Sequence, residues 1–256
     1  MNKNPKISII TVAFNSQSTI RQTIESVFLQ DYDNIEYILI DGGSTDWTLD
    51  IVENYKDRIN YFVSKKDDGI YDAMNKGIRA ATGDIIGILN SDDFYPNKNI
   101  ISDVVDVFNG DNCDSLYGDL VYVKLSNAEK IVRYWKAGIF SILKLKRGWM
   151  LPHPTFFVKK SIYEKYGLYN TKLKSAADYE MILRLLYKQA IKVSYIPNIL
   201  VKMRIGGTSN ANLMNRIRAN REDGKAWQLN NLEEPMFVRL SKPLQKVKQF
   251  FLKPKI

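Results

Sequence analysis

Apolar runs alternate with amphipathic stretches between residues 7 and 94 of the chain. Four strands are predicted by runs of apolar and β-branched residues, at 7–13, 35–40, 59–63 and 84–90. Helices are predicted between them, because apolar residues recur three or four positions apart, as at Ile20, Ile24 and Val27. Strands that are apolar on both faces and alternate with helices indicate a parallel, doubly wound sheet.

This alternation ends after Phe94. Further on, the pattern predicts helices at 104–108 and 177–189 and strands at 116–124 and 131–135, around an aromatic, proline-bearing stretch at 148–158. The order of elements indicates an α+β half that builds a second wall over the first. We therefore expect an α/β fold in three parts, with one half at 1–95, a second half of the same domain at 96–205 and a C-terminal helical extension at 206–256.

Composition narrows the class of protein. The 256 residues are 45% hydrophobic and 12% aromatic, which suffices for a packed core. No apolar run approaches the roughly 18 residues expected of a membrane-spanning helix. The basic start before Ile7 imitates a signal peptide, but no small-residue cleavage site follows, so the segment is interpreted as the first strand. Cys113 is the single cysteine, which excludes an internal disulfide and a cysteine zinc site and favours a cytosolic protein.

The net charge of +9 is unevenly distributed, because six Lys or Arg residues and no acid lie at 236–256. Pro243 can begin and Pro254 must end a short helix there, with apolar residues on one face and lysines opposite. A basic amphipathic helix is typical of proteins that bind a membrane surface. The alternative is a helix that packs on the protein's own core with its lysines in water.

Acidic residues directly follow two of the predicted strands. Asp41-Gly42-Gly43-Ser44 follows the second strand, and Asn90-Ser91-Asp92-Asp93 follows the fourth. The carboxyl ends of parallel strands form the ligand-binding edge of an open sheet, and a bound cation can offset the repulsion between adjacent carboxylates. The pattern therefore favours a divalent cation and a phosphorylated ligand, because Mg²⁺ or Mn²⁺ bridges carboxylates and phosphate oxygens.

Each of these motifs also has a purely structural interpretation. The Asp41 motif suits a strand-to-helix turn in which Ser44 caps the next helix. That turn does not need a carboxylate at Asp41, which can accept the imide N–H of uracil or the N–H groups of guanine. The other motif can be an acidic turn before Phe94, and its spacing alone does not identify which Asp binds the metal.

Asp178 stands at the start of the predicted helix 177–189. An acid in the first turn is favoured by the helix dipole, but beside the other motifs Asp178 is the best candidate for a general base. The single histidine, His153, lies between prolines, where it is either a loop residue or a contact to phosphate, metal or acceptor. The acidic turn at Asp67-Asp68 is either an exposed loop or a contact to a nucleotide.

In this order, the motifs resemble those of family 2 glycosyltransferases, the inverting enzymes with a GT-A fold. The resemblance covers about residues 7–205 and rests on Phe14-Asn15, the Asp41 motif, the run from Gly77 to Asp93 and Ala177-Asp178. The stretch from Asp68 to Gly77, which includes Asn75, resembles in particular the subgroup that builds O-antigen, capsule and exopolysaccharide repeat units.

The resemblance implies a role for each motif. Asp41 would hold the base, Asp92 would bind Mn²⁺ or Mg²⁺ under the diphosphate, and Asp178 would be the catalytic base. Further nucleotide-sugar contacts would come from Ala13, Phe14, Asn15, Asp68, Asn75, Asn90 and Ser91, and additional candidates are Asp93, His153 and Arg204.

Three positions depart from the family pattern. Asn90 stands where many relatives carry the first Asp of the DxD metal motif, and Met74 stands where many carry an Arg before the Asn. Ala177 replaces the Glu of the ED pair, so that Asp178 must act without that neighbour.

The expected function is transfer of a sugar from a nucleotide-diphosphate sugar, with UDP favoured, to a saccharide acceptor, expected to be a lipid-linked oligosaccharide of surface polysaccharide synthesis. One alternative is a nucleotide-sugar nucleotidyltransferase, but residues 14–18 lack the Gly-rich, basic loop that such enzymes need. The other alternative is a nucleic-acid-binding protein that uses the basic tail. We expect a cytoplasmic enzyme that the tail holds on the inner face of the cell membrane, without a nucleic-acid partner.

Overall fold

The computed structural model describes residues 4–206, 213–236, 238, 248–250, 252 and 254. The strands are β1 (Ile7–Ala13), β2 (Ile35–Asp41), β3 (Tyr61–Ser64), β4 (Ile85–Ile88), β5 (Asp93–Phe94), β6 (Ser115–Lys124), β7 (Asn127–Trp135), β8 (Phe157–Lys159) and β9 (Val193–Arg204). The α-helices are α1 (Ile20–Phe28), α2 (Thr48–Glu53), α3 (Ile70–Ala80), α4 (Ile100–Gly110), α5 (Ile142–Lys146), α6 (Lys160–Tyr166), α7 (Ala177–Ile182) and α8 (Leu213–Leu229). Short 3-10 turns lie at Lys56–Arg58, His153–Thr155 and Lys248–Phe250, and a π-helical turn, Leu183–Lys188, continues α7.

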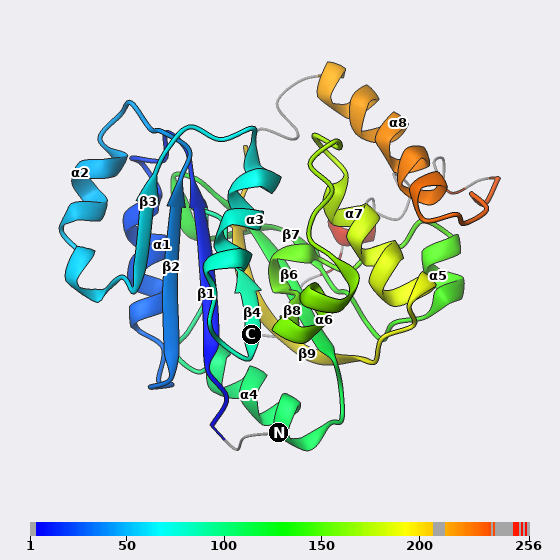
Figure 1. Cartoon of the computed structure of the whole chain (residues 1–256), viewed down its shortest axis with the longest axis horizontal. Helices are drawn as coiled ribbons and strands as arrows, with labels where there is room; N and C mark the ends of the chain where they lie inside the picture. The colour runs from blue at the N-terminus through cyan, green and yellow to red at the C-terminus, as the bar shows by residue number, and fades with distance from the viewer. Residues whose placement is uncertain are drawn as a thin grey trace.

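Within the described residues, one sheet of nine strands runs through both halves of the fold (Figure 1). β3, β2, β1 and β4 are parallel neighbours in that order. β8 joins β4 in the antiparallel direction, and the sheet continues through β6, β9 and β5, while β7 pairs with β6. The parallel register brings the carboxyl ends of β1, β2 and β4 to one edge of the sheet, where the two predicted acidic motifs follow.

Two apolar cores cover the two faces of the parallel half. Ile10 and Val12 of β1 belong to the core that α3 closes, whereas Ile7 and Ile9 belong to the core that α1 and α4 close. Because successive side chains of a strand point to opposite faces, burial on both faces requires an apolar residue at nearly every position. The predicted α/β fold with a doubly wound parallel sheet is thereby confirmed.

The second half packs its helices around the continuous helix formed by α7 and its π-helical turn. α8 lies along the outer side of α7 in Figure 1. Trp227 of α8 is fully buried, and its indole N–H donates to the hydroxyl of Tyr179, 3.1 Å away. The extension predicted at 206–256 is therefore helical over α8 and anchored on the second half.

Some expectations about the extension and the boundaries stay predictions. The helix predicted between Pro243 and Pro254 lies largely outside the described residues, of which Lys248–Phe250 forms a 3-10 turn. The divisions at residues 95 and 205 also stay predictions, since one sheet joins both halves. In the described ranges, no helix combines the length and the apolar composition that crossing a bilayer requires.

Candidate functional site

The turn after β4 is tightly anchored to the helix behind it. Thr23 of α1 directs its hydroxyl to the carbonyl oxygens of Ser91 and Asp93, at 2.9 and 2.7 Å. The hydroxyl groups of Ser16 and Ser91 lie 2.7 Å apart in a buried hydrogen bond. The backbone that carries the Asn90–Asp93 motif is therefore fixed before any ligand binds.

The two carboxyl groups of this turn are in a poorly hydrated environment. Burial raises the pKa of Asp92. The pKa of the fully buried Asp93 lies well above its ordinary value, mainly because of burial and in addition because of the negative charge of Asp92. The amide of Asn90 donates to Asp93 Oδ2 at 3.1 Å. Arg204, at the end of β9, donates to the carbonyl of Asp92 at 2.6 Å and to the side chain of Gln22. Its positive charge offsets only part of the rise in the pKa of the two carboxyl groups.

Two buried oxygens of this turn lack a hydrogen-bond donor. Asn90 Oδ1 and Asp93 Oδ1 have no partner in the described part of the chain, and such groups are rare in folded proteins. Oxygen atoms of this kind are the ligands that Mg²⁺ and Mn²⁺ prefer. Among the described residues, no group of three or more His, Cys, Asp or Glu converges on a point. Asn90 Oδ1 and Asp93 Oδ1 themselves fit a cation that takes its remaining ligands from phosphate oxygens and water.

Asp41 is fully buried and organises the turn after β2. Its Oδ2 accepts hydrogen bonds from the N–H groups of Gly43 and Ser44, both at 2.9 Å, and from the Ser64 hydroxyl at 2.7 Å. Its Oδ1 accepts the Ser44 hydroxyl at 2.5 Å. Both carboxylate oxygens are thus engaged inside the protein, and the contact of Asp41 with a base stays a prediction that this geometry does not favour.

The predicted helix cap at Ser44 is wrong. The hydroxyl of Ser44 is used by Asp41, and α2 begins only at Thr48. The residue at the start of α2 is Trp47, whose side chain makes no capping hydrogen bond, and Asp46 just before it accepts the N–H group of Thr48 at 3.0 Å. A serine that must satisfy a buried carboxylate is not available to cap a helix four residues away.

The end of β1 presents an exposed aromatic ring beside this turn. Ala13 is buried opposite Asp41, whereas the side chain of Phe14 is 62% exposed. Asn15 has a φ of 49°, which directs its N–H group to Ser44 Oγ at 2.8 Å and lets its Oδ1 accept the N–H group of Thr45 at 2.9 Å. This left-handed residue fixes the loop, and the exposed ring of Phe14 is a surface on which a base can stack.

Asp67 approaches this edge more closely than the predicted Asp68. A Cβ atom on Gly42 would lie 2.6 Å from Asp67 Oδ2, so the glycine makes room for that carboxylate. Asp68 is exposed, and its carbonyl accepts the ammonium group of Lys174 at 2.8 Å. The sequence contained a signal for Asp67, since the acidic pair was recognised, but only the packing against Gly42 distinguishes its two members.

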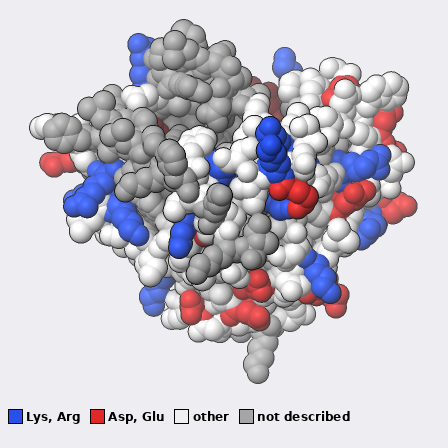
Figure 2. Space-filling view, turned by 180° about the vertical axis from the view of Figure 1, so that it is seen from behind, with Lys and Arg blue, Asp and Glu red and all other residues white. Residues whose placement is uncertain are grey.

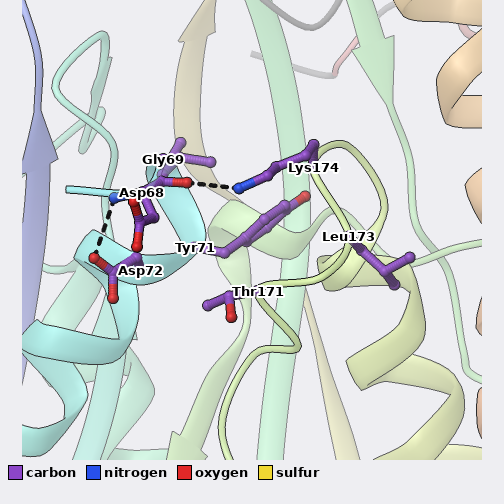
Figure 3. Close-up of a pocket in the computed structure, with 8 residues that line it drawn as sticks. Asp68, Gly69, Tyr71, Asp72, Thr171, Leu173 and Lys174 are labelled. Carbon is purple, nitrogen blue, oxygen red and sulfur yellow. Dashed lines mark hydrogen bonds between the residues drawn. The ribbon is translucent and has the colours of Figure 1, made fainter.

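A small cavity lies where this loop meets the second half, and Figure 3 shows the Lys174 side chain reaching the Asp68 carbonyl across it. The cavity has a volume of about 20 Å³ and is lined by residues of α3 and of the stretch Thr171–Lys174. Such a volume holds about one water molecule. The cavity lies between the two halves of the fold, and it is too small for a nucleotide.

The candidate base Asp178 is held by residues from two other segments. The Tyr71 hydroxyl of α3 donates to Asp178 Oδ1 at 3.0 Å, and His153 Nδ1 lies 3.1 Å from Asp178 Oδ2. The side chains of His153 and Asp178 are 26% and 15% exposed, so both border on solvent. Burial, together with the charge of Asp178, raises the pKa of Tyr71 well above its ordinary value, which keeps its hydroxyl protonated as a donor.

The structure thus brings His153 and Asp178 together. This contact could not be predicted from the sequence, because the two residues are 25 positions apart. Sequence reasoning missed Tyr71, whose partner is 107 residues away. The ring of Tyr71 stacks on Tyr169 at a centroid distance of 5.6 Å. Tyr71 stands in the first turn of α3, between Ile70 and Asp72, and nothing in that local sequence distinguishes it from a core residue.

Asn75 holds the backbone of Tyr169, the residue on which Tyr71 stacks. Its amide nitrogen donates to the carbonyl of Tyr169 and its Oδ1 accepts the Tyr169 N–H group, both at 2.9 Å. Asn75 is buried, and both ends of its amide are engaged. Its predicted contact with the nucleotide sugar stays a prediction, whereas its hold on Tyr169 is evident in the structure.

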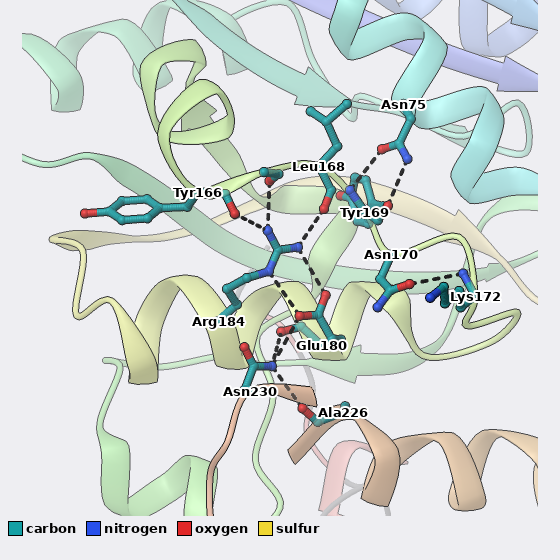
Figure 4. A network of polar contacts seen from close by, with 11 residues as sticks. Asn75, Tyr166, Leu168, Tyr169, Asn170, Lys172, Glu180, Arg184, Ala226 and Asn230 are labelled. Atoms are coloured by element: carbon teal, nitrogen blue, oxygen red, sulfur yellow. Dashed lines mark hydrogen bonds and ion pairs between the residues drawn. The ribbon is translucent and has the colours of Figure 1, made fainter. Parts of the chain in front are cut away.

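α7 is fixed at its sides by a polar network, shown in Figure 4. Arg184 donates to the carbonyl oxygens of Tyr166, Gly167 and Leu168 at 2.5, 2.9 and 2.6 Å and pairs with Glu180 at 3.0 Å. Asn230, just after α8, donates to the carbonyl of Glu180 at 3.2 Å. The loop that carries Tyr169 and the helix that carries Asp178 therefore form one rigid unit.

The start of α7 is held by α8. Glu222 is buried, and its carboxylate accepts the N–H groups of Lys174, Ser175 and Ala176 at 3.1, 2.7 and 3.1 Å. These N–H groups belong to the residues that lead into α7, up to its N-cap residue Ala176. Asp178 lies two residues further on, so the position of the candidate base depends on this contact.

Comparisons with known proteins agree with this architecture. The model of the family "Glycosyl transferase family 2" matches residues 8–167. An uncharacterized glycosyltransferase of Mycobacterium tuberculosis is 33% identical over 187 residues, which cover 72% of this chain and 70% of that protein. A PGL/p-HBAD biosynthesis glycosyltransferase of Mycobacterium bovis is 27% identical over 212 residues, 80% of each protein.

Solved structures share the fold at lower sequence identity. S. aureus TarS (residues 1–349), in complex with UDP-GlcNAc, has a TM-score of 0.68 at 20% identity, over 90% of this chain and 68% of that one. A mannosyltransferase from Pyrobaculum calidifontis, in complex with GDP-Man and Mn²⁺, has a TM-score of 0.65 at 16% identity, over 93% and 69% of the two chains. The fold is that of GT-A glycosyltransferases, as the sequence motifs predicted.

Proposed function

Because the chain belongs to glycosyl transferase family 2, we propose that it transfers a sugar from a nucleoside-diphosphate sugar to a hydroxyl group of a saccharide acceptor, with inversion at the anomeric carbon. The observation that carries the proposal is the pairing of two features. Donorless buried oxygens lie in the turn after β4, and a carboxylate on α7 is oriented by Tyr71 and His153. A UDP-sugar is the favoured donor, in keeping with the UDP-GlcNAc complex of TarS.

The donor would bind along the carboxyl edge of β1, β2 and β4. Phe14 and Asn15 would frame the base together with the Asp41 turn, with Asp67 or Asp68 reaching it from the loop before α3. Asp92, assisted by the oxygens of Asn90 and Asp93, would hold Mn²⁺ or Mg²⁺, and the Mn²⁺ bound to the mannosyltransferase of Pyrobaculum calidifontis supports this choice of cations. A divalent cation there would neutralise charge on the departing nucleoside diphosphate.

Asp178 would act on the acceptor. One oxygen of its carboxylate accepts the proton of the acceptor hydroxyl while the hydroxyl oxygen attacks the anomeric carbon. The bond from the anomeric carbon to the diphosphate oxygen breaks at the same time, and the nucleoside diphosphate leaves with the electron pair. Tyr71 holds the carboxylate by its other oxygen, and His153 restricts its rotation, so Ala177 need not supply the neighbouring carboxylate that many relatives have.

The acceptor and the location belong to the same proposal. A lipid-linked oligosaccharide of surface polysaccharide synthesis fits an enzyme at the cytoplasmic face of the membrane, with the basic tail at 236–256 as one anchor. No observation favours nucleotidyl transfer or nucleic-acid binding. Binding of full-length protein, but not of a 1–235 truncation, to anionic vesicles would support the tail as an anchor, and equal binding would contradict it.

Thermal stabilisation by nucleotide sugars, with and without Mn²⁺, tests the proposal. We expect a UDP-sugar to raise the melting temperature with Mn²⁺ and far less without it, since a ligand that binds only the folded state stabilises that state. The stabilising sugar is then offered with saccharide acceptors, and release of the nucleoside diphosphate is followed. Absence of stabilisation by every nucleotide sugar tried would contradict the proposed donor class.

A further inference from the structure

The loop of residues 136–147, here called the α5 loop, carries exposed aliphatic side chains on an ordered backbone. Ile139 is 74% exposed and Leu143 65%, although both residue types are usually buried. The Tyr117 hydroxyl donates to the carbonyl of Gly138 at 2.7 Å, and Lys144 donates to that of Ile139 at 2.7 Å. The exposure is therefore a property of a fixed conformation.

The same loop has a buried side that holds it in place. Ala137 and Leu145 lie in the core, and the indole N–H of Trp149 donates to the carbonyl of Ala137 at 2.9 Å. With these inward residues anchored, Ile139 and Leu143 are held outward together with Ile142, which is 39% exposed. The loop thus divides its apolar residues between the core and the solvent.

Positive charge surrounds this apolar tip. The loop itself, residues 136–147, carries Lys136, Lys144, Lys146 and Arg147 and no Asp or Glu. Lys136, Lys144 and Lys146 are exposed, and within the described residues none of them pairs with a carboxylate. Figure 2, seen from behind, shows several Lys and Arg side chains on the flank that carries α5 and a closer mixture of both signs on the opposite flank.

We propose that the α5 loop docks on an anionic lipid surface, with Ile139, Ile142 and Leu143 inserted among the lipids and the lysines on the headgroups. Aliphatic side chains that enter the acyl boundary lose their contact with water, while lysines around them contact anionic headgroups with their stems along the apolar surface. A soluble polyanion would satisfy the lysines but would leave the aliphatic residues in water. The combination therefore favours a membrane over a charged polymer.

This surface lies on the same half of the fold as the candidate base, since Leu145 of the loop and Tyr179 of α7 belong to one apolar core. Arg147 precedes His153 by six residues, so roughly 22 Å at most separates their Cα atoms, and His153 contacts Asp178. If the acceptor of the proposed function is lipid-linked, a docked loop brings its saccharide end near Asp178. The inference about the acceptor rests on that proposed function, whereas docking itself does not.

The test is sedimentation of the full chain with vesicles of phosphatidylcholine alone and of phosphatidylcholine with phosphatidylglycerol. Leu143→Glu is compared with Leu29→Glu, because Leu29 is 69% exposed and follows the end of α1, where the chain turns back towards the start of β2. The site lies at the other end of that strand. We expect Leu143→Glu to weaken partition onto the anionic vesicles by roughly tenfold to a hundredfold. Leu29→Glu should bind as the unchanged protein does, and vesicles without phosphatidylglycerol should bind little of any variant.

Equal partition of the two variants onto the anionic vesicles would overturn the proposal. It would also be overturned if the Leu143→Glu variant still bound both the vesicles and heparin, a soluble polyanion, because binding would then depend on charge alone. Both positions are exposed, so the variants should share the melting temperature of the unchanged protein. Stabilisation by a nucleotide sugar is measured on the same samples. Its absence in every variant would contradict the proposed function, while the vesicle result would still decide the docking surface.

Discussion

Removal of the Glu222 carboxylate should loosen the start of α7 and displace the candidate base. The side chain is 7% exposed and accepts three successive backbone N–H groups, at 2.7–3.1 Å. In Glu222→Ala, these groups lose their acceptor and water reaches them only in part. Asp178 lies two residues after Ala176, so the backbone that carries its side chain is no longer held in place, even though the contacts with Tyr71 and His153 remain.

The size of the effect follows from this geometry. A hydrogen bond to a charged group contributes about 1.5–3 kcal/mol to stability. Since one carboxylate serves three N–H groups, we expect the free energy of unfolding to fall by about 2–4 kcal/mol. For a chain of this size, the melting temperature should then fall by roughly 5–15 °C.

Catalysis should suffer separately from stability. A misplacement of about 1 Å can cost about a hundredfold in rate, so we expect kcat to fall by roughly tenfold to a hundredfold at a temperature where the variant is folded. The KM for the donor should change little, since the proposed donor site lies at the carboxyl edge of β1, β2 and β4. Glu222→Gln keeps one acceptor oxygen and should lie between the unchanged protein and Glu222→Ala.

Steady-state kinetics and thermal unfolding are measured on both variants and on a control, Glu164→Ala. Glu164 is exposed and pairs with Lys160 only at the surface, a kind of contact worth about 1 kcal/mol at most. Unchanged kcat and melting temperature in Glu222→Ala would refute the reasoning. A lower melting temperature with unchanged kcat would leave Glu222 a stabilising residue that does not position Asp178.

Three further predictions follow from the site and the sheet. Asp92→Asn should remove most transfer activity and the effect of Mn²⁺ on the melting temperature in the presence of donor, while circular dichroism stays unchanged; full turnover of the unchanged protein in excess EDTA would contradict this. Asn75→Ala should lower the free energy of unfolding by about 1–3 kcal/mol, because the backbone of Tyr169 loses both partners; an unaltered denaturation midpoint would argue against it. Burial raises the pKa of Glu36, but hydrogen bonds from Ser8, Thr82 and Lys6 lower it to about 2 overall. Since the folded pKa is below the ordinary value of 4.5, the charged form stabilises the fold above pH 4.5, and this contribution is lost as the pH falls towards 2. Glu36→Gln should therefore lower stability at neutral pH and flatten its decline between these two values, and parallel curves for the two proteins would count against the assignment.

The parallel half could be predicted from the sequence because its signals are local. β1 and β2 are buried on both faces, so nearly every position favours an apolar residue, and the run itself reveals the strand. Asp92 and Asp178 become candidates by a similar argument, since they stand after a predicted strand and at the start of a predicted helix, and their roles stay predictions. The predicted strand at 59–63 begins instead at Tyr61, because Ile59 ends the preceding 3-10 turn.

The contacts that hold the candidate base could not be predicted, because they join residues that no local pattern relates. Tyr71 and Asp178 are 107 positions apart, and Glu222 meets the start of α7 across 46 to 48 positions. The same limit applies to Asp41, whose type and position suit base recognition but whose oxygens are occupied by Ser44 and Ser64. Only the packed structure shows which polar groups are already satisfied.

The most direct test of the proposed transfer is turnover of Asp178→Asn, measured beside its affinity for the donor. A positioned general base contributes about 10²–10⁴-fold in rate, so turnover should fall by that factor. Affinity for the nucleotide sugar should stay nearly unchanged, and the exposed control Asp57→Asn should match the unchanged protein in both measurements. Wild-type turnover in Asp178→Asn would contradict the role of this carboxylate as the base, and loss of donor binding would assign it to the nucleotide site instead.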